Sequence, residues 1–236
     1  MRKKKTVLKV SLLIVTTVFL SGVIFAMCFR DGLIMDWIGI HAELPFGKKV
    51  NIGIINEDVD NNKNGISDPI DIVNAARQEV KNKTTYKSAY YVGGYPPNNE
   101  GVCTDVVWRA YKGIGVSLKD LMDKDIAENT ELYPRVHGKP DPNIDFRRVV
   151  NQLVYFERHF ENLPVEIDVK DIENLKQFQP GDIIVYTDGY EHVGIVSDRR
   201  SRSGIPYIIH NGGPVPSEIK LTSIKIPIRG HFRWSF

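Results

Sequence analysis

Residues 101–111 read GVCTDVVWRAY and place one of the chain's two cysteines, Cys103, at the start of an amphipathic segment. Behind the cysteine, apolar side chains recur at helical spacing at Val106, Ala110 and Ile114. This spacing predicts a helix that begins near Cys103. We therefore expect the thiol at a helix N-terminus, where the dipole and unpaired N–H groups lower a thiol pKa.

The segments around this helix divide the chain into a helical half and a β-rich half. Helical spacing or capping signals appear first, and short runs of β-branched and aromatic residues between turn formers appear later. Helices followed by an antiparallel sheet predict an α+β domain. The expected helices are 70–81, 103–113, 117–126 and 149–160, and the expected strands are 182–186, 192–196 and 207–210.

The N-terminus carries a basic cluster at residues 2–5, followed by an uncharged, largely apolar run from Val10 to Phe29. Twenty residues at helical rise span roughly 30 Å, the thickness of a bilayer core. The basic cluster predicts a cytoplasmic N-terminus, so the rest of the chain should lie outside the membrane. We expect a signal anchor over residues 1–30, with a cleaved signal peptide as the alternative.

Charge and cysteine count restrict what the external part can do. Residues 1–30 hold six of the 31 lysines and arginines and no acidic residue, which leaves 25 basic and 29 acidic side chains beyond them. A nucleic-acid partner is not expected, because it would require a basic domain. Cys28 lies in the apolar run, so Cys103 has no partner for an intrachain disulfide. It is then either a buried small hydrophobe or a working thiol.

A working thiol requires a histidine, and two of the six stand out. His192 and His210 each lie at the end of an expected strand, where neighbouring strands can hold both on one side of a sheet. One would accept the thiol proton and the other would orient the first imidazole, with Asn211 as the alternative orienting residue. The others are expected to be structural, namely His41, His137, His159 and His231.

Four motifs in order resemble the NlpC-type papain-like cell-wall peptidases: residues 90–94 (YYVGG), Cys103 opening a helix, residues 180–182 (PGD) before a strand, and residues 192–195 (HVGI). The longer phrases GVCTDVVWRAY, PDPNIDFRR, HVGIVSD and IHN resemble more closely the family called domain of unknown function 1287. The similarity covers roughly residues 58–236. The broader family usually has Asp before and Ser after the cysteine, where this chain has valine and threonine, so the substrate is less certain than the thiol chemistry.

The resemblance implies a papain-like α+β fold in which N-terminal helices pack on a small antiparallel sheet. It implies that Cys103 is the nucleophile, His192 the general base and His210 the orienting residue, and that Tyr90 lines the oxyanion site. The expected organisation is a cytoplasmic tail and anchor at 1–30, a juxtamembrane linker at 31–57, and a cysteine hydrolase domain at 58–236.

Three further residues are candidates for contacts with substrate. Tyr95 offers aromatic surface in the turn-rich loop before Cys103. Arg147 and Arg148 could hold the carboxylate of a cell-wall peptide through paired hydrogen bonds. The alternative for the arginines is an ion pair with Asp145 that braces a loop.

Residues 60–71, DNNKNGISDPID, match the calcium-loop pattern of oxygen ligands at alternating positions with glycine at position six. Aspartate replaces the usual glutamate at position twelve, so we expect weak, structural binding of Ca²⁺, with a Kd on the order of 10⁻⁴ to 10⁻³ M. The alternative is an Asn/Asp-rich turn without a metal. The expected ligands are Asp60, Asn62, Asn64, Ile66, Asp68 and Asp71.

Together these patterns predict a membrane-anchored, outward-facing cysteine hydrolase that cleaves amide bonds in cell-wall peptides and needs no cofactor for catalysis. Its partners would be the peptide substrate and the cell membrane. Two alternatives stay open: a catalytically silent cell-wall binding module, and an acyltransferase that uses the same thioester chemistry with an acceptor other than water.

Overall fold

The computed structural model describes residues 2–41 and 49–235, and the chain divides into two compact units, Met1–Phe46 and Gly47–Phe236. The first unit holds a long helix and two short helical turns. These are α1 (Arg2–Cys28), η1 (Phe29–Gly32) and α2 (Leu33–Trp37).

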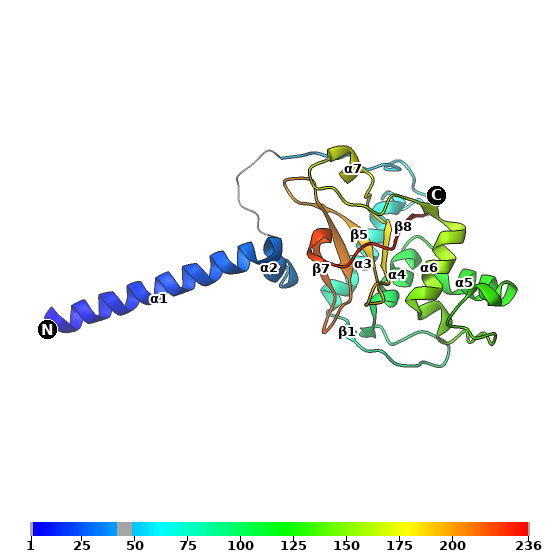
Figure 1. The fold of residues 1–236 in the computed structure, drawn as a ribbon, viewed down its shortest axis with the longest axis horizontal. Helices are drawn as coiled ribbons and strands as arrows, with labels where there is room; N and C mark the ends of the chain where they lie inside the picture. The colour runs from blue at the N-terminus through cyan, green and yellow to red at the C-terminus, as the bar shows by residue number, and fades with distance from the viewer. Residues whose placement is uncertain (1, 42–48, 236) are drawn as a thin grey trace. The chain divides into compact units, whose positions relative to one another are not determined.

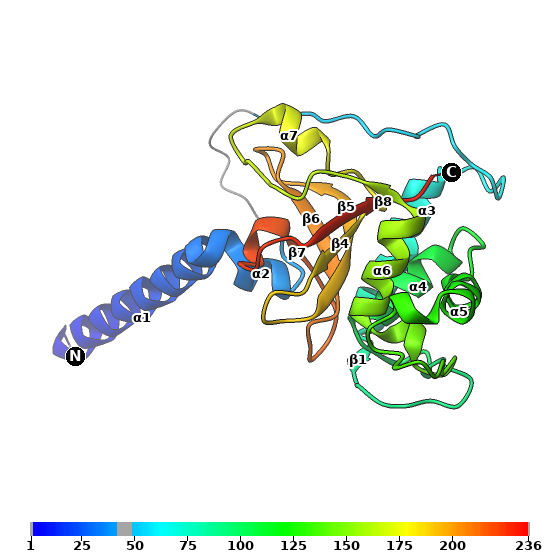
Figure 2. The same cartoon turned by 45° about the vertical axis from the view of Figure 1, so that its right-hand side comes forward.

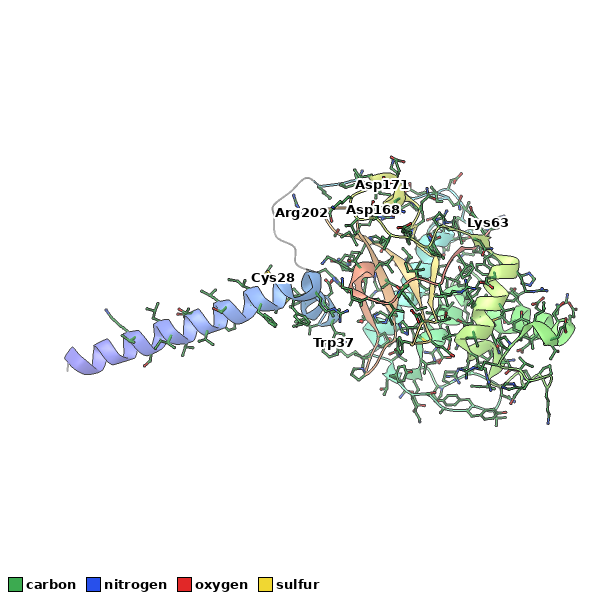
Figure 3. All side chains as sticks on the ribbon, viewed as in Figure 1. Cys28, Trp37, Lys63, Asp168, Asp171 and Arg202 are labelled. Atoms are coloured by element: carbon green, nitrogen blue, oxygen red, sulfur yellow. The ribbon has the colours of Figure 1, made fainter. Side chains whose placement is uncertain are left out.

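Helix α1 contains the apolar run expected from the sequence. Its segment Lys9–Cys28 has a mean hydropathy of 2.4 over 20 residues, and none of it is buried. Figure 3 shows the side chains of α1 projecting from all sides of the helix, including the labelled Cys28 at its end. The segment is long and apolar enough to cross a bilayer. These properties are consistent with a membrane anchor or a signal sequence.

The second unit is an α+β domain, as the sequence predicts. Helices precede most of a six-stranded antiparallel sheet in the order β3-β8-β4-β5-β6-β7, and a parallel two-stranded ladder joins β1 to β2. The helices are α3 (Asp68–Asn82), α4 (Cys103–Lys112), α5 (Leu118–Glu128), α6 (Val149–His159) and α7 (Ile172–Lys176). The strands are β1 (Thr85–Tyr86), β2 (Glu100–Gly101), β3 (Glu161–Asn162), β4 (Ile183–Tyr186), β5 (His192–Arg200), β6 (Pro206–His210), β7 (Ser217–Lys220) and β8 (Gly230–Arg233), with short 3₁₀ turns η2 (Thr130–Leu132), η3 (Asp145–Arg147) and η4 (Leu221–Ser223).

The core lies between one face of this sheet and the helices α3, α4 and α6, which stand together beside the strands in Figures 1 and 2. Val193 and Ile195 of β5 are fully buried there, against α4 residues such as Val107. Gly194 lies between them because a Cβ at this position would come within 2.8 Å of Ile208 on β6. The HVGI motif therefore allows β6 to approach β5 closely, which positions the ends of both strands.

Helix α4 begins at Cys103 because Val102 leaves helical geometry, with φ −122° and ψ −173°. The carboxylate of Asp105 accepts a hydrogen bond from the Val102 N–H at 2.7 Å, which satisfies a donor at the helix start. Cys103 is thereby fixed as the first residue of the helix, as its sequence position predicts.

The expected linker 31–57 is not a single segment. Its first part forms α2 in the N-terminal unit, and residues 42–48 lie outside the described residues. Residues 49–57 belong to the second unit, where the Val50 N–H donates to the Arg202 carbonyl at 2.8 Å and the Ile55 N–H donates to Gln179 at 3.2 Å. The folded domain therefore begins before residue 58.

Candidate active site

Cys103 lies at the N-terminus of α4 against the sheet, with 6% of its surface exposed. Burial raises the pKa of the thiol to about 11, although the backbone N–H groups of Val193 and Thr104 act in the opposite direction. The expectation that the helix N-terminus would lower this pKa is therefore outweighed by desolvation. At neutral pH the thiol is uncharged in this conformation.

The sulfur contacts the backbone N–H of Val193, and the residue before Val193 in the chain is His192, the first residue of β5. This imidazole is 2% exposed, and its Nε2 lies 2.8 Å from Nδ1 of His210 at the end of β6. The other nitrogen, Nδ1 of His192, is buried and has no hydrogen-bond partner among residues 2–41 and 49–235. The structure thus joins the two histidines selected from the sequence and leaves one imidazole nitrogen available.

The hydrogen bonds continue beyond His210 and determine which ring nitrogen of each histidine carries the hydrogen. The Nε2 of His210 lies 3.3 Å from the hydroxyl of Ser217, which opens β7. If Nδ1 of His192 is to accept a proton, its Nε2 must carry the hydrogen and donate to Nδ1 of His210. The Nε2 of His210 then donates to Ser217. Ser217 was not a candidate in the sequence, because its position beside His210 depends on the β6–β7 pairing.

Both imidazoles are neutral when folded. Burial lowers the pKa of His192 to about 3, with a contribution from His210, and burial lowers the pKa of His210 to about 4. In the unfolded chain, each titrates near 6.5. As the pH falls below this value, the unfolded state therefore takes up protons before the folded state does.

We accordingly expect the free energy of unfolding to fall between pH 6.5 and pH 4, by about 1.4 kcal/mol per pH unit for each histidine. Urea unfolding at a series of pH values measures this slope, and His210→Asn should reduce it. The matched control is His137→Asn, because His137 is exposed in a loop. An unchanged slope in His210→Asn would show that the buried histidine pair does not set the acid sensitivity.

Two tyrosines that the sequence did not single out lie close to the thiol. Burial raises the pKa of Tyr86 and of Tyr190, and in both cases the charge of an ionised Cys103 would raise it further. The Tyr190 ring also stacks on the His192 ring, with centroids 5.1 Å apart. Tyr190 is therefore a neighbour of both the sulfur and the imidazole.

Tyr90, the residue expected at the oxyanion site, is 55% exposed and makes its hydrogen bonds elsewhere. Its hydroxyl donates to Asp141 at 3.1 Å and accepts from the Asn143 amide at 2.9 Å. Tyr86, four residues earlier in the chain, has an electrostatic interaction with Cys103.

Asn211, the alternative orienting residue, instead ties the end of β6 to the strand before the cysteine. Its amide donates to the Gly101 carbonyl at 3.2 Å, and its side-chain oxygen accepts from the Gly213 N–H at 3.2 Å. The contact with His192 is made by His210. Asn211 therefore links the backbone just before Cys103 to the backbone just after His210.

The two arginines expected to bind substrate are used within the domain. Arg147 is buried and donates to both carboxylate oxygens of Asp105, at 2.7 and 2.8 Å. Arg148 is half-buried, lies 3.4 Å from Asp145 and donates to the Arg135 carbonyl at 2.8 Å. The bracing alternative therefore describes both side chains, although the partner of Arg147 is Asp105 rather than Asp145. The third guanidinium nitrogen of Arg147, Nη1, donates to the Ala89 carbonyl at 2.8 Å, so all three nitrogens bond within the domain.

The loop at residues 60–71 gathers side chains at the start of α3. The amides of Asn62 and Asn64 donate to the Asp71 carboxylate at 2.8 and 2.7 Å, and Asp60 accepts from the Gly65 N–H at 2.8 Å. Gly65 has φ +85°, the left-handed geometry that the sixth position of a calcium loop needs. Two of the expected ligands, Asn62 and Asn64, thus contact the carboxylate of a third, Asp71, while Asp60 binds the backbone of the same loop.

Two other expected ligands are placed differently. Asp68 accepts hydrogen bonds from the backbone and amide of Asn61, the nearer at 2.7 Å, and Ile66 donates its N–H to Asn64 at 2.8 Å. Lys63 is exposed on this loop at the surface of the domain (Figure 3). Within the described residues, no group of three or more His, Cys, Asp or Glu side chains is arranged to hold a metal.

Comparison with known proteins shows the family to which the chain belongs. A family model with the description Domain of unknown function (DUF1287) matches residues 73–234, which include Cys103 and both site histidines. The chain belongs to this family. It is also 37% identical over 172 residues to the uncharacterized protein YijF of Escherichia coli (strain K12), with 69% of this chain and 80% of that protein covered. No solved structure matches the chain. The DUF1287 match leaves out the calcium-like loop at 60–71 and the whole N-terminal unit.

Proposed function

We propose that this protein is a membrane-tethered cysteine hydrolase that acts outside the cytoplasm on amide bonds, with cell-wall peptides as its substrate class. The observation that carries the proposal is the buried, unpartnered Nδ1 of His192, on an imidazole whose Nε2 is held at 2.8 Å by His210. A general base needs one nitrogen free for the proton and the other fixed by a second group. Leaving a buried nitrogen unpaired costs about 1–3 kcal/mol, and acceptance of a proton during the reaction would account for keeping this one.

A papain-like arrangement of the domain agrees with this proposal. The cysteine opens α4, this helix packs on an antiparallel sheet, and the base and orienting residue lie on the adjacent strands β5 and β6. The orientation outside the cytoplasm rests on the basic cluster that precedes the apolar part of α1.

The chemistry begins from an uncharged pair. The thiol proton passes to Nδ1 of His192 as the sulfur attacks the substrate carbonyl carbon, because neither group is charged at rest. The oxygen of the tetrahedral intermediate would meet the N–H groups of Cys103 and Thr104 at the start of α4, since helix N-termini leave such donors without an intrahelical acceptor. The C–N bond then breaks, and His192 returns the proton to the leaving amine. Water hydrolyses the remaining thioester with His192 again acting as base.

Digestion of purified peptidoglycan and of a peptide library, followed by mass spectrometry, tests the proposal. Hydrolysis adds the elements of water to each pair of products, whereas acyl transfer joins the acyl part to another amine or alcohol. We expect hydrolysis products. An acceptor adduct in their place would identify an acyltransferase.

A second candidate is a catalytically silent cell-wall binding module. It is favoured by the 6% exposure of Cys103 and by the burial that raises its pKa to about 11, since both keep the thiol unreactive in this conformation. The absence of any product under conditions where the folded protein binds the cell wall would support this alternative.

We also propose that the loop at residues 60–71 binds Ca²⁺ as a structural ion that clamps the start of α3. Asp60, Asn62, Asn64 and Asp71 would supply side-chain oxygens, and ion binding would replace the present amide contacts to Asp71. The ion takes no part in the thiol chemistry.

Adding about 10 mM Ca²⁺ should raise the stability of the domain by about 1–3 kcal/mol, given a Kd between about 10⁻⁴ and 10⁻³ M. Differential scanning calorimetry measures this as a higher Tm, and Asp71→Asn should remove most of the increase. If calorimetric titration gives no heat and the Tm does not move, the loop is an ordinary Asn/Asp turn.

A further inference from the structure

A cavity lies along the C-terminal part of helix α4, away from Cys103. Its volume is about 530 Å³, and it is enclosed by the loop 95–98, by α4, and by the turn and first residues of α5. Lys112, one of its lining residues, lies nine residues after Cys103, which corresponds to about 13 Å along the helix. Cavities of this size commonly accept small ligands.

An aromatic wall closes one side of this cavity. Tyr95 packs on Trp108 with ring centroids 4.8 Å apart and meets the edge of Phe146 at 5.8 Å. Although it is held by these two rings, Tyr95 remains 45% exposed. One aromatic face is therefore available to a ligand without a change in the core.

The loop that carries Tyr95 is held in place by α4. Arg109 donates to the Pro97 carbonyl at 3.0 Å and to the Glu100 carbonyl at 2.9 Å, and it pairs with the buried Glu79 at 2.5 Å. The wall is therefore pre-organised, and little ordering entropy is lost when a ligand binds.

The charge of the cavity is positive. Lys112 is exposed and forms no hydrogen bond or ion pair with residues 2–41 or 49–235, and Lys119 lines the cavity while it pairs with Asp123. No acidic residue is among the described side chains that line it. Asn98 and Ser117 add an amide and a hydroxyl for neutral polar groups.

We propose that this cavity binds a saccharide that carries a carboxylate. A sugar ring presents a flat C–H face that suits an exposed aromatic ring, and its hydroxyls suit the amide and hydroxyl groups opposite. The free ammonium of Lys112 would pair with the carboxylate. The choice of a cell-wall sugar rests on the proposed function. The glycan strand would bind in this cavity, at a distance from the amide bond that Cys103 is proposed to cleave.

Calorimetric titration of the full chain in lipid nanodiscs tests the cavity with two probes. One is chitotetraose, which is neutral, and the other is the N-acetylglucosaminyl-N-acetylmuramic acid disaccharide, which carries one carboxylate. We expect both to bind. Tyr95→Ala should weaken both by about tenfold. Lys112→Gln should weaken the carboxylated probe by about tenfold and leave the neutral probe within about twofold.

The matched control is Lys170→Gln, which removes an exposed lysine outside the cavity and should change neither affinity. Cys103→Ala should bind both probes as the wild type does, so the cavity can be established even if no hydrolysis is found. The proposal is overturned if neither probe binds saturably, if Lys112→Gln and Tyr95→Ala behave like Lys170→Gln, or if a nucleotide such as uridine monophosphate binds more tightly than the carboxylated sugar.

Discussion

Replacing Cys103 by alanine is expected to reduce the hydrolysis of cell-wall peptides by about 10⁴-fold or more. In the proposed mechanism the Cys103 thiol supplies the attacking atom, and the sequence has no other cysteine in the second unit. His192→Ala should cause a loss of the same order, because the buried thiol stays protonated without a base. The double variant should be no worse than either single variant, since nucleophile and base act as one unit. Mass spectrometry of peptidoglycan digests measures all three rates.

The hydrogen-bond chain predicts graded losses in the residues behind the base. His210→Ala frees the His192 ring to rotate and should cost about 10²-fold, and Ser217→Ala should cost less, because it acts through His210 alone. Tyr90→Phe is a useful control, because its hydroxyl bonds Asp141 and Asn143. Full activity in Cys103→Ala would contradict the thiol mechanism. A loss of activity in Tyr90→Phe as large as that in His210→Ala would show that Tyr90 contributes to the active site.

The parts of the fold that the sequence predicted are those with strong local signals. The helix at Cys103 and the helix expected from residue 117 follow from local spacing, and in the structure the Ser117 hydroxyl accepts a hydrogen bond from the Asp120 N–H at the start of α5. Strands β7 and β8 were not expected, because SEIK and GHFR are short and half polar. They form because β6 and β4 offer them edges, which is information that no local pattern contains.

The candidate site likewise has features that the sequence predicts and features that it cannot predict. Cys103, His192 and His210 lie at element ends that can be recognised in the sequence, and the sheet brings the two histidines within hydrogen-bonding distance. The charge states could not be read from the sequence, because they depend on burial by the whole domain. A helix N-terminus predicts a lowered thiol pKa, yet desolvation of Cys103 reverses the sign.

The role of Arg147 could not be predicted from the sequence either, because its partner lies forty-two residues earlier in the chain. Two arginines in a turn-rich segment suggest a carboxylate in the substrate, whereas the carboxylate that Arg147 binds belongs to Asp105 of α4. That same carboxylate also accepts from the Val102 N–H and the Trp108 indole N–H. The ion pair therefore anchors the start of the helix that carries Cys103.

Replacing Arg147 by methionine should destabilise the domain by about 3–5 kcal/mol, because it leaves the Asp105 carboxylate buried and without its cation. The two side chains are only 2% and 1% exposed, so solvent cannot compensate for the loss. Urea unfolding measures the change. The double variant Arg147→Met with Asp105→Leu removes both charges and should recover part of the loss, since an apolar pair avoids the unpaired charge. Arg148→Met is the matched control, because that side chain is 32% exposed, and it should cost less than about 1 kcal/mol. If Arg147→Met unfolds at the same urea concentration as Arg148→Met, the buried pair does not anchor α4, and Arg147 becomes available again as a substrate ligand.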